Sequence, residues 1–166
     1  MTEDPSPVRH ASQLRMPTIA VPIRLAVVGR EPAPAELFVA DVPRSGRSEL
    51  VDDVAAALDD ALTFVPVRGD SGVVLLAKHA IAWVAIGFED SPSEVSTLYD
   101  RQHRVEIVLA GGGTVTGAFL DSLPADRPRV VDHLNRAGRF VRVWSSDTHY
   151  LVNALQIVEV RELPDG

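Results

Sequence analysis

The chain has 166 residues, of which 46% are hydrophobic and 23% charged, so it has globular composition and enough length for one ordinary domain or two small ones. Its formal net charge of −7 disfavours binding to phosphate backbones, and the lack of cysteine excludes disulfides, thiolate metal sites and a cysteine nucleophile. No apolar run reaches the roughly 20 residues of a membrane span, and the acidic, proline-containing start does not resemble a secretory signal. We therefore expect a cytoplasmic protein without a membrane partner.

The first half predicts five strands and one helix, after a flexible segment at residues 1–20. Alternating or continuous apolar residues predict strands at 21–28, 35–42, 63–68, 73–78 and 81–86. Apolar side chains recur at helical spacing over 48–60, which predicts a helix with Ser48 as its N-cap. Residues 88–103 are polar and contain proline and several serines, so they are expected to form a linker, with one helical turn at 93–99 as an option.

The second half predicts the same series of elements. Strands are expected at 104–110, 115–120, 140–143, 150–152 and 157–160. The glycines at 111–113 predict a hairpin turn, because glycine adopts positive φ at least cost. Val130, Val131 and Leu134 mark a short amphipathic helix that Asp126 can cap.

The two halves align with each other along their whole length. Residues 75–84 align without a gap on 151–160, 63–67 on 139–143, 50–54 on 130–134 and 36–39 on 117–120. We infer a duplicated unit of the form β-β-α-β-β-β, with two unrelated β-rich halves as the alternative. Five short strands bury their apolar face most easily as a curled barrel, with the helix at one open end. A single sheet running through both halves would contradict this interpretation.

The second unit carries the motifs D-x-L-N, R-F, Y-L-V-N and I-x-x-V. These motifs resemble bacterial domains of unknown function in the Sm-like group, which are SH3-type small barrels. The matching residues are Asp132, Leu134, Asn135, Arg139, Phe140, Leu151, Val152, Asn153, Ile157 and Val160, and the first unit keeps Asp52, Phe64, Leu75 and Ile81. The resemblance implies a mainly β protein of two tandem Sm-like, SH3-like barrels, over 21–87 and 104–162.

Several of these residues are candidates for binding a ligand or a partner. Asn153 falls at a tight junction between two strands, and in Sm proteins a residue near such a junction lines an RNA pocket. The resemblance therefore makes Asn153 a candidate ligand contact. The structural alternative is that its side chain bonds to nearby backbone in the turn. Asn135 is expected to end its helix in the left-handed conformation. Asp132 is expected to support the helix start or to pair with an arginine. The chain has one concentration of basic residues: Arg127, Arg129, Arg136, Arg139 and Arg142. It is interpreted either as a docking patch for a partner, with Tyr150 as a neighbouring aromatic candidate, or as a solvated face.

No catalytic or phosphate-binding motif accompanies the repeat, and the five histidines form no recognised metal pair. We therefore expect a protein that is not an enzyme and needs no metal or cofactor. The leading hypothesis is an adaptor or assembly protein that acts through contacts with a protein partner or through self-association at its sheet edges. The alternatives are an Sm-like RNA-binding regulator, which the acidic charge disfavours, and a sensor of a small ligand such as a nucleotide.

Overall fold

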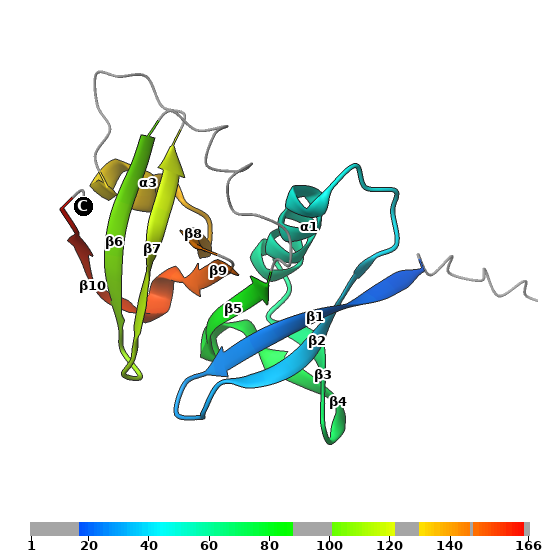
Figure 1. Cartoon of the computed structure of the whole chain (residues 1–166). Helices are drawn as coiled ribbons and strands as arrows, with labels where there is room; N and C mark the ends of the chain where they lie inside the picture. Colours follow the sequence, from blue (N-terminus) through cyan, green and yellow to red (C-terminus); the bar gives the residue numbers. More distant parts are fainter. Residues whose placement is uncertain (1–16, 88–100, 122–129, 147, 165–166) are drawn as a thin grey trace, which may run out of the picture.

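The computed structural model describes residues 17–87, 101–121, 130–146 and 148–164. These residues form a mainly β fold, as predicted, with ten antiparallel strands in one sheet and two α-helices (Figure 1). Most of the predicted flexible segment 1–20 and of the predicted linker 88–103, the optional helical turn at 93–99 and the predicted helix cap Asp126 lie outside the described residues. Residues 18–20 and 101–103, where the structure describes these two segments, belong to strands, so the predicted bounds are wrong there. None of the helices within the described ranges is long and apolar enough to cross a membrane.

The elements follow the predicted order in both halves. The first half contains β1 (Thr18–Val27), β2 (Ala33–Ala40), α1 (Arg47–Asp59), β3 (Phe64–Gly69), β4 (Gly72–Ala77) and β5 (Ile81–Gly87). The second half contains β6 (Arg101–Leu109), β7 (Thr114–Asp121), α3 (Val130–Arg136), β8 (Phe140–Ser145), β9 (Thr148–Asn153) and β10 (Ile157–Glu162). Short 3-10 helices, Lys78–Ala80 and Ala154–Gln156, join the last two strands of each half. Strands β1 and β6 each begin three residues before the predicted position.

Two local predictions about helix ends are wrong. The N-cap of α1 is Gly46 in extended conformation and not Ser48, and its first turn is supported by Glu49, whose carboxylate accepts a hydrogen bond of 2.7 Å from the backbone N–H of Ser45. Asn135 does not end α3 in the left-handed conformation, because positive φ in the described residues occurs only at glycines. The turn predicted at 111–113 is present between β6 and β7, with Gly112 and Gly113 at φ of 84° and 91°.

The expectation of a separate sheet for each half is wrong. The order of strands is β10-β6-β7-β8-β9-β5-β1-β2-β3-β4, so one unclosed sheet runs through both halves. The halves meet where β5 pairs antiparallel with β9, from Trp83 opposite Val152 to Gly87 opposite Thr148. Each of these strands would otherwise be an edge of its own half, and their pairing satisfies backbone groups that an edge leaves open. We call this β5–β9 contact the inner junction.

The two halves nevertheless share one pattern of strand pairing. Phe64 lies opposite Ala77 in the first half, and Phe140 lies opposite Asn153 at the aligned positions of the second. The last strand of each half contains a bulge at the same aligned position, at Ala82 in β5 and at Val158 in β10. Residues aligned from the sequence alone therefore occupy equivalent places in the sheet.

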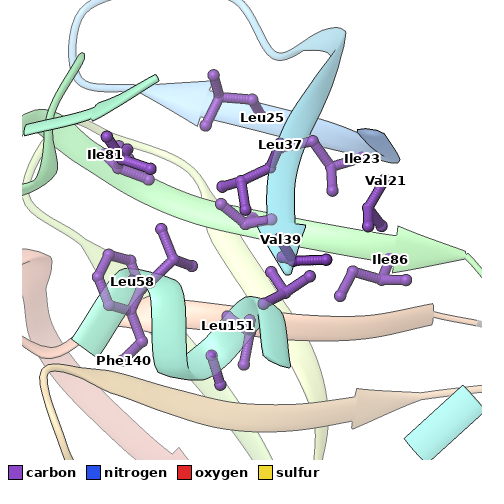
Figure 2. Packing of buried hydrophobic residues seen from close by; sticks show 14 of the residues in the cluster. Val21, Ile23, Leu25, Leu37, Val39, Leu58, Ile81, Ile86, Phe140 and Leu151 are labelled. Carbon is purple, nitrogen blue, oxygen red and sulfur yellow. The ribbon is translucent and has the colours of Figure 1, made fainter. Parts of the chain in front are cut away.

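The hydrophobic residues form two cores, and each core includes residues from both halves. The first core lies under α1, where Val51, Val54 and Leu58 pack against β1, β2 and β5. It also includes Phe140 and Leu151 of the second half, and Figure 2 shows both of them near Leu58 of α1. Helix α1 thus covers the inner junction as well as its own sheet.

The second core is built on β6, β7, β8 and β9 and takes in Ala26 and Ala82 from the first half. Its strands β7 and β8 approach so closely that a Cβ on Gly117 would lie 2.3 Å from the carbonyl oxygen of Trp144. A glycine is therefore required where these two strands cross.

Candidate interaction site at the sheet edges

The two ends of the sheet are β4 and β10, which lie far apart on opposite sides of the molecule (Figure 1). Within the described sheet, β4 pairs with β3 on one side and β10 pairs with β6 on one side. The outer backbone N–H and C=O groups of both strands can therefore accept a further strand.

The β4 end of the sheet carries the main exposed apolar surface. The sequence of β4 is Gly-Val-Val-Leu-Leu-Ala, without a charge or proline that would protect an edge. Leu75 is 70% exposed and Phe64 on β3 is 54% exposed, and Leu62, Val73 and Val74 are exposed beside them. An uncharged, apolar edge strand is a place where a protein adds a strand from another chain. We call this surface the β4 edge.

The β10 end carries a groove between the strand and α3. Its volume is about 660 Å³, and it is lined by Val130, Val131, Leu134, Ile157, Val158, Glu159, Val160 and Glu162. Val131 is 53% exposed and Val158 is 65% exposed, and none of the described residues of α3 is fully buried. We call this feature the α3–β10 groove. Seven of the ten exposed large hydrophobic residues of the described chain lie at the β4 edge or in this groove, so apolar exposure is concentrated at the two ends.

The inner junction shows how such surfaces are covered in this protein. Val84 of β5 lies opposite Leu151 of β9, and both side chains are fully buried. Phe140 and Leu151 pack beneath α1 together with Ile81 and Val84. The last strand of one half and the preceding helix thus form a site that is filled by a phenylalanine and a leucine from the other half.

Asn153 anchors the inner junction by hydrogen bonds. Its Nδ2 donates to the carbonyl oxygens of Lys78, at 3.2 Å, and Ile81, at 2.8 Å, both in the first half. Its Oδ1 accepts from the backbone N–H of Leu155, at 3.0 Å, which is the turn role offered as the structural alternative. The side chain is fully buried, and the bonds it makes join the two halves.

Two acidic residues of α1 also reach the second half. Asp59 accepts a hydrogen bond of 3.0 Å from the backbone N–H of Phe140 and lies against Gly138, where a Cβ would be 2.8 Å from its Oδ2. Asp52 pairs with Arg142 at 2.5 Å, an exposed ion pair of modest value. The contact between α1 and β8 thus involves charged groups as well as apolar packing.

The chain's one lysine lies beside this junction. The side chain of Lys78 is 1% exposed, and its Nζ lies 2.5 Å from Oδ1 of the partly exposed Asp60. This hydrogen bond lowers the pKa of the Asp60 carboxyl. This pair was not predicted from the sequence, where its only signal is a single lysine in an arginine-rich chain, at the end of an apolar strand.

The other predicted site residues do not form one cluster around Asn153. Tyr150 is half-buried on β9 and meets Trp83 of β5 edge to face, with ring centroids 5.4 Å apart. Asn135 and Arg136 are exposed on α3, Arg139 is half-buried before β8, and Arg129 lies outside the described residues. Among the described residues, neither Arg136 nor Arg139 pairs with Asp132. The motif residues Leu134, Ile157, Phe64 and Ile81 lie in the α3–β10 groove, at the β4 edge or in the first core.

His149 faces the inner junction, on β9 opposite Ile86 of β5. Its pKa is lowered to about 4, first by burial and then by the charge of Arg142, while the charge of Asp52 opposes the shift. The ring lies edge-on to Trp144, with centroids 5.1 Å apart. The folded protein therefore holds this imidazole neutral at pH 7.

A second hollow, of about 610 Å³, lies between the β1–β2 and β6–β7 turns and includes Arg30, Trp83 and the glycines at 111–113. In the described ranges, no group of three or more His, Asp or Glu side chains is placed to hold a metal ion. Comparisons with protein-family models, with curated proteins and with solved structures find no match to this chain.

Proposed function

We propose that this protein is a non-catalytic assembly or adaptor protein, made of two Sm-like units, that acts by pairing its free sheet edges with other protein strands. The single observation that carries the proposal is the β4 edge. Its backbone groups are open on one side, it has no protecting charge, and Leu75 and Phe64 are exposed beside it. Burying such a surface against a further strand combines main-chain hydrogen bonds with apolar contact.

The duplication of a small curled unit is part of the same proposal. It is supported by the equal order of elements, by the equal opposition of Phe64 with Ala77 and Phe140 with Asn153, and by the bulge at the same position in β5 and β10. A duplicated unit whose copies join edge to edge has already used one pair of edges for assembly. Of the remaining pair, at β4 and β10, the β4 edge is the one without a protecting charge.

Contact with protein is favoured over contact with RNA. Within the predicted basic concentration, Arg142 is paired with Asp52 across the inner junction. The chain as a whole carries a net charge of −7, which opposes the counterion-driven part of nucleic-acid binding.

A charge placed on the β4 edge tests the proposal. Leu75→Lys alters an exposed side chain, so folding should be retained, and Val42→Lys makes the same change at an exposed residue after β2. We expect the wild-type chain and Val42→Lys to bind protein, either a second copy or a partner recovered from the source cells, and Leu75→Lys to lose that binding. The mass in solution by sedimentation and the recovered partners are compared for the three chains. Equal behaviour of wild type and Leu75→Lys in both measurements would refute the proposal.

A further inference from the structure

We propose that the hollow between the β1–β2 and β6–β7 turns binds a free α-amino acid with an apolar side chain. We call this feature the turn hollow; its volume is about 610 Å³. It is lined by the end of β1 and the turn that follows, by the start of β5, and by the glycine-rich turn between β6 and β7. Both halves of the chain therefore form its walls, and the two turns lie side by side (Figure 1). The turn hollow shares no residue with the β4 edge, so this inference goes beyond the proposed function.

The turn hollow is open because few side chains are present to fill it. Gly112 and Gly113 have positive φ, which favours glycine over other residues. Gly111 is different, because its φ is not positive and a Cβ there would lie 3.4 Å from Cγ1 of Val28, which is van der Waals contact. Neither backbone conformation nor close approach requires glycine at this position, and its effect is to leave the hollow open.

Hydrogen bonds hold the two turns in fixed positions on either side of the hollow. The N–H of Val28 donates to the carbonyl oxygen of Ala80 at 2.9 Å. The N–H of Ala110 donates to the carbonyl oxygen of Gln156 at 2.8 Å. The Nε2 of Gln156 donates in turn to the carbonyl oxygen of His79 at 2.8 Å, which joins the two 3-10 helices. The site is therefore formed before a ligand arrives, which lowers the entropy cost of binding.

Trp83 provides the main apolar surface of the turn hollow. Its side chain is half-buried, and its ring is held edge to face against Tyr150, with centroids 5.4 Å apart. The apolar residues Val27 and Leu109 also line the hollow. An indole offers a large apolar area for contact, so an apolar side chain of a ligand can be buried against Trp83.

Two opposite charges, those of Arg30 and Glu31, line the hollow and are exposed to solvent. Within the described residues, neither side chain forms an ion pair or a hydrogen bond with another residue. A guanidinium can bind a carboxylate through two parallel hydrogen bonds, and a carboxylate can accept from an ammonium group. A free α-amino acid carries both of these groups on one carbon, and its side chain remains free to contact Trp83.

Other classes of small molecule match this set of groups less well. A nucleotide would bring its phosphate close to Glu31 as well as Arg30, in a chain whose net charge is −7. An uncharged apolar molecule would leave both charged side chains without a role. The combination of one cation, one anion and one indole therefore favours a zwitterion with an apolar side chain.

Isothermal titration calorimetry of the full chain with L-phenylalanine tests the inference. L-phenylalaninamide lacks the carboxylate, N-acetyl-L-phenylalanine lacks the ammonium group, and both keep the ring, so they are matched control ligands. We expect L-phenylalanine to bind and each derivative to bind at least about tenfold more weakly, because each leaves one charge of the protein without its partner.

Arg30→Gln and Glu31→Gln assign the two ends of the ligand. Both residues are exposed, so both variants should fold. Arg30→Gln should weaken binding of L-phenylalanine about tenfold and leave binding of the amide unchanged, because the amide has no carboxylate. Glu31→Gln should weaken L-phenylalanine by a similar factor and leave the N-acetyl derivative unchanged. Arg24→Gln alters an exposed arginine of β1 outside the hollow and should bind L-phenylalanine as the wild type does.

Trp83 reports where the ligand binds. The chain has two tryptophans, so Trp144→Phe leaves Trp83 as the only one. We expect the fluorescence of this variant to change when L-phenylalanine is added, with the same midpoint as in calorimetry. Binding without any change in the emission of Trp83 would place the ligand elsewhere and overturn the inference.

Three further results would also overturn it. The first is the absence of binding of both L-phenylalanine and L-leucine at millimolar concentration. The second is equal binding of L-phenylalanine and its two derivatives, which would show an apolar site that does not recognise the charges. The third is binding of adenosine monophosphate and not of an amino acid. None of these results bears on the proposed function, which Leu75→Lys tests at the β4 edge.

Discussion

Asn153 offers the sharpest test of how the two halves are held together. Its replacement by alanine removes two hydrogen bonds to the carbonyl oxygens of Lys78 and Ile81 and one from the N–H of Leu155. The side chain is fully buried, so water does not replace the lost partner. Each buried group left without a partner costs about 1–3 kcal/mol, and the three share one site. We expect Asn153→Ala to lower the free energy of unfolding by about 3 kcal/mol.

Urea denaturation followed by tryptophan fluorescence measures this loss, because Trp83 lies on β5 at the inner junction. With a slope of about 2 kcal/mol/M, the midpoint should fall by about 1.5 M. Asn135→Ala, on the exposed side of α3, is the matched control and should change stability by less than about 0.5 kcal/mol. A loss below about 1 kcal/mol for Asn153→Ala would show that the amide does not anchor the junction and would return Asn153 to the candidates for a ligand contact.

Three further predictions concern pH, charge and packing. The pKa of His149 is lowered from 6.5 to about 4, mainly by burial, so between these pH values the folded state binds fewer protons than the unfolded state. The free energy of unfolding should therefore fall by about 3 kcal/mol as the pH drops from 7 to 4. Urea titrations of His149→Asn at both pH values should lack that part of the loss. Asp60→Ala leaves the buried ammonium of Lys78 without its carboxylate and should lower the free energy of unfolding in urea by about 3 kcal/mol. Lys78→Met leaves only an exposed carboxylate and should cost less than about 1 kcal/mol. Equal costs would contradict the assignment of Lys78 as the buried partner of the ion pair. Gly117→Ala places a Cβ against backbone and should lower the thermal midpoint by several degrees, while Gly87→Ala, with open space around it, should not; similar midpoints would contradict the close approach of β7 and β8.

The local structure was largely readable from the sequence because it depends on short-range patterns. Alternation of apolar residues located the strands within a few residues, and helical spacing located α1 and α3. The alignment sets Phe64 on Phe140, and in the sheet these residues lie opposite Ala77 and Asn153, which are also aligned. Helix ends were less accurate, because Gly46 and Asn135 depend on backbone geometry that several residue types can adopt.

The pairing between the halves could not be read in this way. Strand β5 is apolar and β9 contains the apolar residues Leu151 and Val152, which is equally consistent with burial inside one barrel and with pairing across two. The bonds of Asn153 to the carbonyl oxygens of Lys78 and Ile81 exist only through that pairing, so they had no local signal in the sequence. The exposure of Phe64 and Leu75 could not be predicted from the sequence either, because their aligned residues Phe140 and Leu151 are buried.

The difference between Asn153 and its aligned residue Ala77 distinguishes the inner junction from the β4 edge. A shift of one residue at the inner junction would turn each side chain of β9 to the other face and leave the buried amide of Asn153 without its carbonyl partners. The hydrogen bonds of Asn153 therefore hold the inner junction in one register as long as the chain is folded. At the β4 edge the aligned residue is Ala77, so a strand that leaves this edge exposes no buried polar side chain there. Under the proposed function, this is why pairing at the inner junction is permanent and pairing of another protein strand at the β4 edge is reversible.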